Sequence, residues 1–336
     1  MAKFLTSARS VDMLGRQQIA GIPTAVSEIF KNAYDAYATS VRGDFFLDDR
    51  VFVIRDNGVG MTSDDFQTRW LTVGTDSKAP GTGLPPIPRP TGVDERKQMG
   101  EKGIGRLAIA TIGPQLLIAT RAERNLDTSD DEVTLALIQW TLFEVPGLTL
   151  DDVVIPMRRI GAIDQADAGI LRSMRDEVAS AVNGLAERVP PTYHKRIEEE
   201  LGYLEFDPRR YLKLNGPNLA REPGTAFIVT PVSDDVDAVM EIRDTKVDEF
   251  SVSEFQRFLL GFTNTILPEA NSPDFATEFI RHDGPSPRDI IDPNSYFWSA
   301  DDFKNTDHTI EGIFDKYGLF SGTLSIYGTD PVEIIE

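Results

Sequence analysis

Three short elements that combine glycines with polar or charged residues follow one another early in the chain. Their sequences are Glu28-Ile-Phe-Lys-Asn32-Ala-Tyr-Asp35-Ala, Asp56-Asn-Gly58-Val-Gly60-Met61 and Gly100-Glu-Lys102-Gly103-Ile104-Gly105-Arg. The first lies among apolar residues at helical spacing, which predicts a helix from Ile22 to about residue 40, with Pro23 in its first turn. The second follows two alternating segments, 41–47 and 50–55, which predict a hairpin. A helix followed at once by a hairpin that ends in a glycine turn therefore constrains the fold of the amino-terminal region.

Further helices and strands are predicted along the rest of the chain. Residues 79–92 hold five Pro and three Gly, which indicates a long loop. A helix is predicted to begin at 103–106, and strands at 115–121, 133–144 and 225–230. Two helices, at 163–187 and 193–203, form an insertion at about 151–215. An amphipathic helix is predicted at 253–267, followed by short strands at 275–281, 309–314 and 320–327.

Length and composition narrow the class of protein. At 336 residues, the chain is long enough for two domains, each with a buried core. Its net charge of -20 argues against a general surface for polyanions, because phosphate contacts need clustered Lys and Arg. It contains no cysteine, which excludes disulfides and Cys-ligated metals. Neither a signal peptide nor an apolar run of transmembrane length is present, so we expect a cytoplasmic protein without a membrane partner.

The first element places three polar side chains on one face of the predicted helix. Glu28, Asn32 and Asp35 are spaced i, i+4 and i+7, and the apolar residues lie on the other side. A carboxylate near bound phosphates can act as a general base toward water. Asn offers a neutral oxygen to Mg²⁺, which prefers oxygen ligands. Taken alone, the same three residues are also typical of a solvated helix face.

The second element suits the recognition of a planar base. A buried carboxylate at Asp56 can accept a hydrogen bond from the exocyclic amine of adenine. Gly58 and Gly60 have no Cβ, so the backbone can pass close to the base. Met61 offers a soft apolar surface against it. A simple turn is the alternative interpretation of this segment alone.

The third element is a glycine-rich turn ahead of a helix. Backbone N–H groups at a helix N-terminus bind anions, and Gly103 and Gly105 would let the chain wrap phosphate oxygens. Lys102 and Arg106 could add positive charge. The turn is not a Walker A loop, since no Gly-Lys-Ser/Thr follows, and no strand precedes it as in a dinucleotide-binding fingerprint.

In this order and spacing, the elements resemble the N box, G1 box and G2 box of the GHKL ATPase superfamily, which includes DNA gyrase B subunits, heat-shock chaperones, sensor histidine kinases and MutL. Gly224-Thr225 resembles the final Gly-Thr element of the family. The resemblance covers roughly 20–270 and implies a Bergerat-type α/β sandwich, in which helices cover one face of a mixed, mostly antiparallel sheet.

The resemblance also implies roles for individual residues. Glu28 would be the general base, Asn32 the Mg²⁺ ligand, and Asp35 a support of the pocket near the base or ribose. Asp56 would contact the adenine amine with the help of Thr225, and Gly58, Gly60 and Met61 would line the base. Gly103, Ile104 and Gly105 would bind phosphates through their backbones, together with Lys102.

The resemblance predicts a domain organisation as well. Residues 1–270 would form the ATP-binding domain, with a lid at about 75–102. Residues 271–336 would begin a transducer-like second domain, within which we expect the chain to stop. Such a domain usually supplies a lysine to the γ-phosphate, and Lys304 and Lys316 are both available. The Asn-Ala-Tyr-Asp-Ala sequence and the segment 72–78 are most similar to the MutL, microrchidia and chaperone branches.

These features predict a Mg²⁺-dependent ATPase that works as a clamp. ATP would close the lid and join two chains into a homodimer, in DNA handling or in bacterial anti-phage defence. Any contact with DNA would lie in a missing carboxy-terminal part of the protein or in a partner subunit. One alternative is histidine-kinase-like phosphotransfer to a separate chain, because no His precedes the N box. The other is a nucleotide sensor with negligible turnover.

Overall fold

The computed structural model describes residues 6–17, 21–72, 87–96, 99, 105–123, 132–236, 255, 275–284, 286–290, 306–315 and 317–335. The chain divides into two compact units. The first comprises residues 1–263 and 274–291, and the second comprises residues 264–273 and 292–336.

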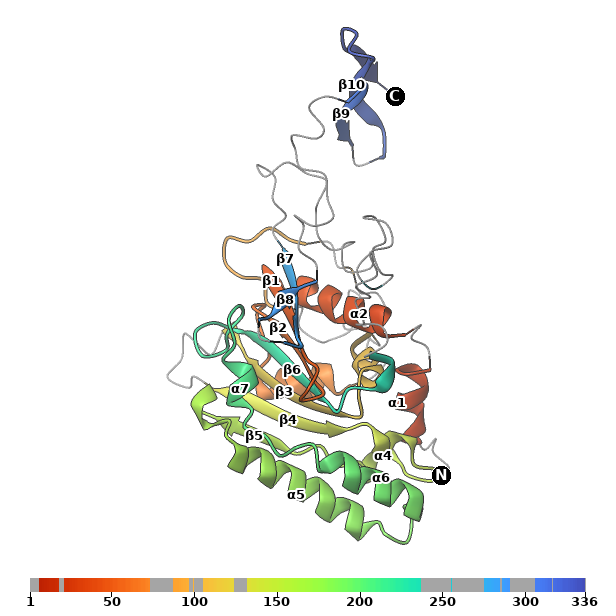
Figure 1. Cartoon of the computed structure of the whole chain (residues 1–336), viewed down its shortest axis with the longest axis vertical. Helices are drawn as coiled ribbons and strands as arrows, with labels where there is room; N and C mark the ends of the chain where they lie inside the picture. Colours follow the sequence, from red (N-terminus) through yellow and green to blue (C-terminus); the bar gives the residue numbers. More distant parts are fainter. Residues whose placement is uncertain are drawn as a thin grey trace, which may run out of the picture. The chain divides into compact units, whose positions relative to one another are not determined.

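The first unit is built on one large sheet with the strand order β5-β4-β3-β6-β2-β1-β7-β8 (Figure 1). Neighbouring strands are antiparallel, except that β1 and β7 are parallel. The mixed, mostly antiparallel sheet expected from the sequence is therefore confirmed. Its strands are β1 (Ser40–Phe46), β2 (Val51–Asp56), β3 (Gln115–Arg121), β4 (Val133–Gln139), β5 (Met157–Ile160), β6 (Gly224–Thr230), β7 (Ala276–His282) and β8 (Arg288–Asp289).

One face of the sheet is covered by α2 (Ile22–Asp35), which packs against the 3₁₀ helix η2 (Gly105–Thr111). The helix α1 (Arg9–Leu14) lies beside them. The apolar side of α2 is buried as predicted, at Val26, Ile29, Phe30 and Ala33. The helix ends at Asp35 rather than near residue 40, because Tyr37 takes a left-handed conformation with φ of 61°.

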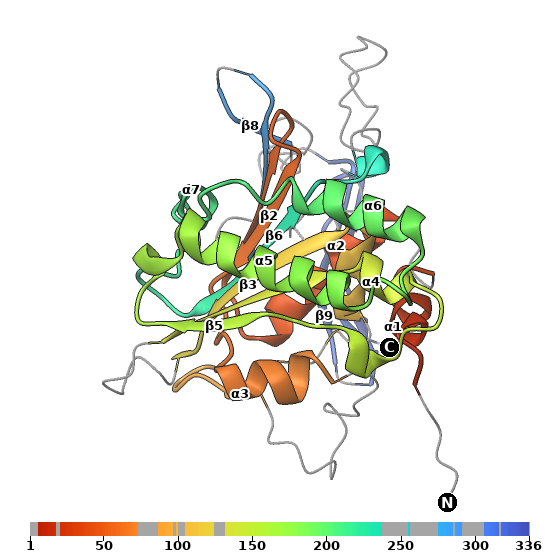
Figure 2. The same ribbon diagram turned by 90° about the horizontal axis from the view of Figure 1, so that it is seen from below.

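The predicted insertion covers the opposite face. Its helices are α5 (Ala168–Gly184), α6 (Pro191–Leu201) and α7 (Arg209–Leu212). Figure 2 shows α5 and α6 in front of the strands, and Figure 1 shows α2 on the other side. Every residue of β2, β3 and β4 is buried, so both faces of the sheet are enclosed. The resemblance implies helices on one face only, and the insertion adds the second layer.

A buried arginine holds the end of the insertion on this second face. Arg55 of β2 is 1% exposed and donates hydrogen bonds to Asp44 on β1 and to the carbonyls of three residues that follow α7. These carbonyls belong to Leu214, Asn215 and Pro217, at 2.7–2.9 Å. Since a buried charge needs such partners, the pairing ties 214–217 to the sheet.

Short helices complete the first unit. They are α3 (Ser63–Asp65), the π-helix η1 (Phe66–Trp70), α4 (Thr141–Glu144), η4 (Leu150–Asp152) and η5 (Ile163–Gln165). Thr62 and Asp65 form a capping box at the start of α3. None of the helices in the described ranges is long and apolar enough to cross a lipid bilayer.

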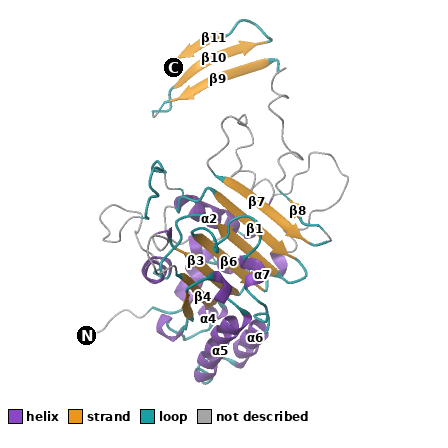
Figure 3. Ribbon diagram, turned by 90° about the vertical axis from the view of Figure 1, so that its left-hand side faces the viewer, coloured by secondary structure: helices purple, strands orange, loops and turns teal. Residues whose placement is uncertain are grey.

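The second unit contains a three-stranded antiparallel sheet in the order β11-β10-β9 (Figure 3). Its strands are β9 (His308–Phe314), β10 (Phe320–Ile326) and β11 (Val332–Ile335). The first two form a hairpin, with Gly318 at φ of 85° in its turn.

The predicted strand at 275–281 is confirmed as β7, but it belongs to the first unit. It pairs in parallel with β1 over its whole length, from the pair Ser40 and Ala276 to the pair Phe46 and His282. The boundary expected at residue 270 therefore does not coincide with the division of the structure, which assigns 274–291 to the first unit. The predicted helix at 253–267 lies outside the described residues, apart from Phe255.

Candidate nucleotide site

The helix α2 supplies the first part of the site. Asp35 is buried at 4% exposure, whereas Glu28 and Asn32 are partly exposed. The Glu28 carboxylate accepts a hydrogen bond from Lys31 on the same helix, with 2.8 Å between Oε1 and Nζ. Its other oxygen, Oε2, lies against Gly105, where an added Cβ would overlap with it. The first and third sequence elements therefore meet at the Glu28 carboxylate.

Asp35 forms a hydrogen bond with the predicted lid that the sequence does not predict. Its Oδ1 accepts a hydrogen bond from the Met99 backbone N–H at 2.7 Å. Nearby, Arg96 donates to the carbonyls of Tyr34 and Ala38, at 3.2 and 2.7 Å. The Arg96 guanidinium also lies 4.7 Å from the centre of the Tyr34 ring. The end of the predicted lid is therefore fastened to the carboxyl end of α2, and Asp35 is part of that attachment.

The beginning of the lid has its own attachment. Arg106, at the start of η2, donates to the carbonyls of Arg69 and Thr72, the second at 3.0 Å. Burial lowers the pKa of Arg106 from its ordinary value to about 10. This side chain serves the segment that leads into the lid, whereas the sequence interpretation assigned it to phosphates.

Asp56 stands at the end of β2, on the sheet face that α2 covers. It is 6% exposed, and its Oδ1 accepts the Gly58 backbone N–H at 2.9 Å. Burial raises the pKa of the carboxyl from 3.8 to about 7, and hydrogen bonds from the backbones of Gly58 and Thr225 oppose the rise. The carboxylate therefore lies in a dry environment, where a neutral donor such as an amine would bind it strongly.

The glycine turn packs tightly on the neighbouring strands. Gly60 has φ of 59°, and an added Cβ would overlap with the Arg121 carbonyl of β3. A Cβ on Gly58 would lie 2.7 Å from the Ala36 carbonyl oxygen, which also accepts the Val59 N–H at 2.9 Å. These contacts exclude a simple exposed turn, because the backbone is wedged between α2 and the sheet.

A buried threonine that sequence reasoning missed joins the second and fourth motifs. The Thr120 hydroxyl is bonded to the Met61 N–H at 2.9 Å, the Gly224 carbonyl at 3.0 Å and the Thr225 hydroxyl at 3.1 Å. Its side chain is 0% exposed. The register of β3 with β6 and of β6 with β2 places Thr120, Thr225 and Asp56 side by side on one face of the sheet.

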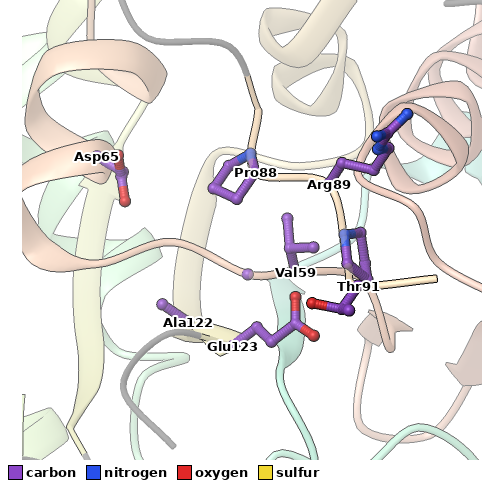
Figure 4. A pocket seen from close by; sticks show the side chains of 9 residues that line it. Val59, Asp65, Pro88, Arg89, Thr91, Ala122 and Glu123 are labelled. Carbon is purple, nitrogen blue, oxygen red and sulfur yellow. The ribbon is translucent and has the colours of Figure 1, made fainter. Parts of the chain in front are cut away.

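A pocket borders this turn on the side of the lid (Figure 4). It lies between the glycine turn, the end of α3, the residues that follow β3 and the described lid segment 87–91. Its lining residues are Val59, Gly60, Asp65, Pro88, Arg89, Pro90, Thr91, Ala122 and Glu123. The lid therefore reaches the same glycine that is predicted to line the base.

The structure thus brings Glu28, Asn32, Asp35 and Gly105 together around α2, and Asp56, Gly58, Gly60, Met61 and Thr225 together at the sheet. Lys102, Gly103 and Ile104 lie outside the described residues, as do Lys304 and Lys316. Within the described ranges, no group of three His, Cys, Asp or Glu could hold a metal ion.

One comparison with known proteins matches the part of the chain that carries these residues. The sequence model described as histidine kinase-, DNA gyrase B-, and HSP90-like ATPase matches residues 21–142, which include all three motifs around α2, the glycine turn and η2. Residues 21–142 are therefore similar to the GHKL ATPases, and this similarity supports ATP binding and ATPase-type activity in general.

Two other comparisons carry no further information on function. No curated protein matches the sequence. A solved structure titled "Crystal Structure of N terminal domain of a DNA repair protein" is similar over 95% of this chain and 69% of its own chain, with 10% identity and a TM-score of 0.43.

Proposed function

We propose that this chain hydrolyses ATP with the help of Mg²⁺. The observation that carries the proposal is the position of the Glu28 carboxylate, which lies directly against Gly105 of the predicted phosphate-binding turn. A carboxylate at that place would stand beside the terminal phosphates of a bound nucleotide. Because it is one-quarter exposed, water could reach it.

The base end of the site fits adenine. Asp56 is buried, and the hydrogen bonds described above leave its carboxylate with further acceptor capacity, which suits the exocyclic amine. Gly58 and Gly60 keep the neighbouring backbone close, and the Thr225 hydroxyl lies next to Thr120 on the adjacent strands. Met61 would present an apolar surface to the ring.

The reaction would use few side chains. Glu28 would accept a proton from the water that attacks the γ-phosphate. Backbone N–H groups of Gly103, Ile104 and Gly105, with Lys102, would hold the phosphates at the start of η2. Asn32 would give an oxygen to Mg²⁺, and the bound ion would neutralise charge that develops on the phosphates.

We further propose that ATP closes the lid and joins two chains as a clamp. Both ends of the predicted lid are attached at the site, by Arg106 at its start and by Arg96 and Met99 at its end. Such attachment lets the segment between them close over a nucleotide and exclude water. The family resemblance favours DNA handling or bacterial anti-phage defence, with a partner subunit or DNA as the client.

Two alternative functions, phosphotransfer to another chain and nucleotide sensing, differ from ATP hydrolysis in their products. In phosphotransfer to another chain, labelled phosphate would appear on the partner. Two of the chain's own histidines, His194 and His282, instead pair with Asn183 and Asp44 at 3.0 and 2.9 Å, away from Glu28. A nucleotide sensor would bind ATP without releasing phosphate.

The test is Mg²⁺-dependent phosphate release by the purified protein and by Glu28→Ala. We expect release that is lost in Glu28→Ala, and an ATP analogue that doubles the mass in solution. Glu198→Ala, on the exposed side of α6, is the matched control and should behave as the unaltered protein. Binding without release in the unaltered protein would contradict the hydrolase, and lack of binding would contradict the site.

A further inference from the structure

Lys31 lies within the first motif, between the predicted base Glu28 and the predicted magnesium ligand Asn32. Its ammonium is 2.8 Å from Glu28 Oε1, and the two side chains are 33% and 24% exposed. An exposed i, i+3 pair on a helix usually contributes little to stability. This pair differs from such surface pairs, because the second oxygen of the same carboxylate is in contact with Gly105.

Helix geometry places Lys31 on the face that bears the site. At 100° per residue, Glu28, Lys31, Asn32 and Asp35 fall within about 100° of arc around α2. The Lys31 ammonium reaches the Glu28 carboxylate along this face. Any phosphate close enough to share a water molecule with Glu28 would therefore lie within reach of Lys31.

Three described arginines around the site are directed toward the protein backbone, whereas Arg89 lines the pocket beside the glycine turn. Arg96 donates to the carbonyls of Tyr34 and Ala38, Arg106 to that of Thr72, and Arg121 to that of Leu219. A triphosphate needs charge-assisted donors of its own. A lysine suits this role, because its compact charge sits on a flexible stem that can change partners.

We propose that Lys31 contacts the terminal phosphate of ATP and exchanges its ion pair with Glu28 for that contact. Without a γ-phosphate, as with ADP or no nucleotide, the ammonium stays on Glu28 and occupies the carboxylate oxygen. With ATP, the ammonium moves to the phosphate, and Glu28 becomes available to accept a hydrogen bond from water. Lys31 thereby distinguishes a triphosphate from a diphosphate. This inference rests on the proposed nucleotide site.

The test compares binding of a non-hydrolysable ATP analogue with binding of ADP, both with Mg²⁺, by titration calorimetry. We expect Lys31→Gln to lose about tenfold in affinity for the analogue, equivalent to about 1.4 kcal/mol, and to retain its affinity for ADP. Lys31→Arg, which keeps the charge, should retain most of the preference for the triphosphate.

Lys195→Gln is the matched control, because Lys195 forms an exposed pair with Glu199 on α6. It should bind both nucleotides as the unaltered protein does. Equal losses for both nucleotides in Lys31→Gln, or no loss for either, would overturn the role of Lys31 and leave the site intact. Failure of the unaltered protein to bind either nucleotide would instead overturn the proposed site itself, and with it the inference.

Discussion

Replacement of Asp56 by Asn should make the nucleotide-free protein more stable at neutral pH and less able to bind ATP. The Asp56 side chain is buried, and burial raises its pKa from 3.8 to about 7. An Asn at this position carries no charge, so it avoids the cost of a buried carboxylate. It would keep an oxygen for the Gly58 N–H.

The size of the effect follows from the pKa values. Since the pKa is higher in the folded state, the folded protein retains a proton that the unfolded chain releases between pH 3.8 and about 7. Asp56 therefore favours folding most below pH 3.8, and this contribution is lost as the pH rises to about 7. The complete loss corresponds to about 4 kcal/mol, as an order of magnitude, with a slope of about 1.4 kcal/mol per pH unit.

One cost of the substitution does not depend on pH. The carboxylate accepts hydrogen bonds from the backbones of both Gly58 and Thr225, whereas Asn has a single oxygen. The lost hydrogen bond costs about 1 kcal/mol. The decisive quantity is therefore the change with pH of the difference between the two proteins.

The assay is urea unfolding of both proteins at pH 5, 6, 7 and 8 without nucleotide. The advantage of Asp56→Asn should grow by about 2–3 kcal/mol from pH 5 to pH 7 and then level off. Asp151→Asn, which alters an exposed carboxylate in η4, should show no such trend. A difference between Asp56→Asn and the unaltered protein that stays constant over this range would refute the reasoning.

Three further substitutions test the geometry of the site. Gly105→Ala should keep the fold but displace the Glu28 carboxylate. Phosphate release should therefore fall about 100-fold while nucleotide still binds. Unchanged release would contradict the contact between Glu28 and Gly105. Arg96→Ala should lose about 2 kcal/mol of lid attachment, and hydrogen exchange in 87–96 should become faster. Gly60→Ala should lower the free energy of unfolding by about 2 kcal/mol or more. Gly92→Ala is the control and should cost clearly less, because its Cβ would meet no neighbour. Equal losses of unfolding free energy in the two variants would argue against the tightly packed glycine turn.

The local elements of this fold are determined by short stretches of sequence. Apolar residues at helical spacing place α2, and alternation places the β1–β2 hairpin, because these patterns reflect burial on one side of a single element. The capping box at Thr62 and Asp65 likewise needs only residues three apart. The motif residues on these elements could therefore be named, and their family resemblance stated, before any tertiary contact was known.

Contacts between distant segments were decided by the tertiary structure. The parallel pairing of β7 with β1 joins residues more than two hundred positions apart, and nothing in either strand alone specifies that partner. The meeting of Thr120 with Thr225 follows from the register of β3 and β6. The burial that shifts the pKa of Asp56, the contact of Glu28 with Gly105 and the bond from Met99 to Asp35 arise in the same way. Local sequence sets which side chains an element presents, whereas the packing of elements sets which of them meet.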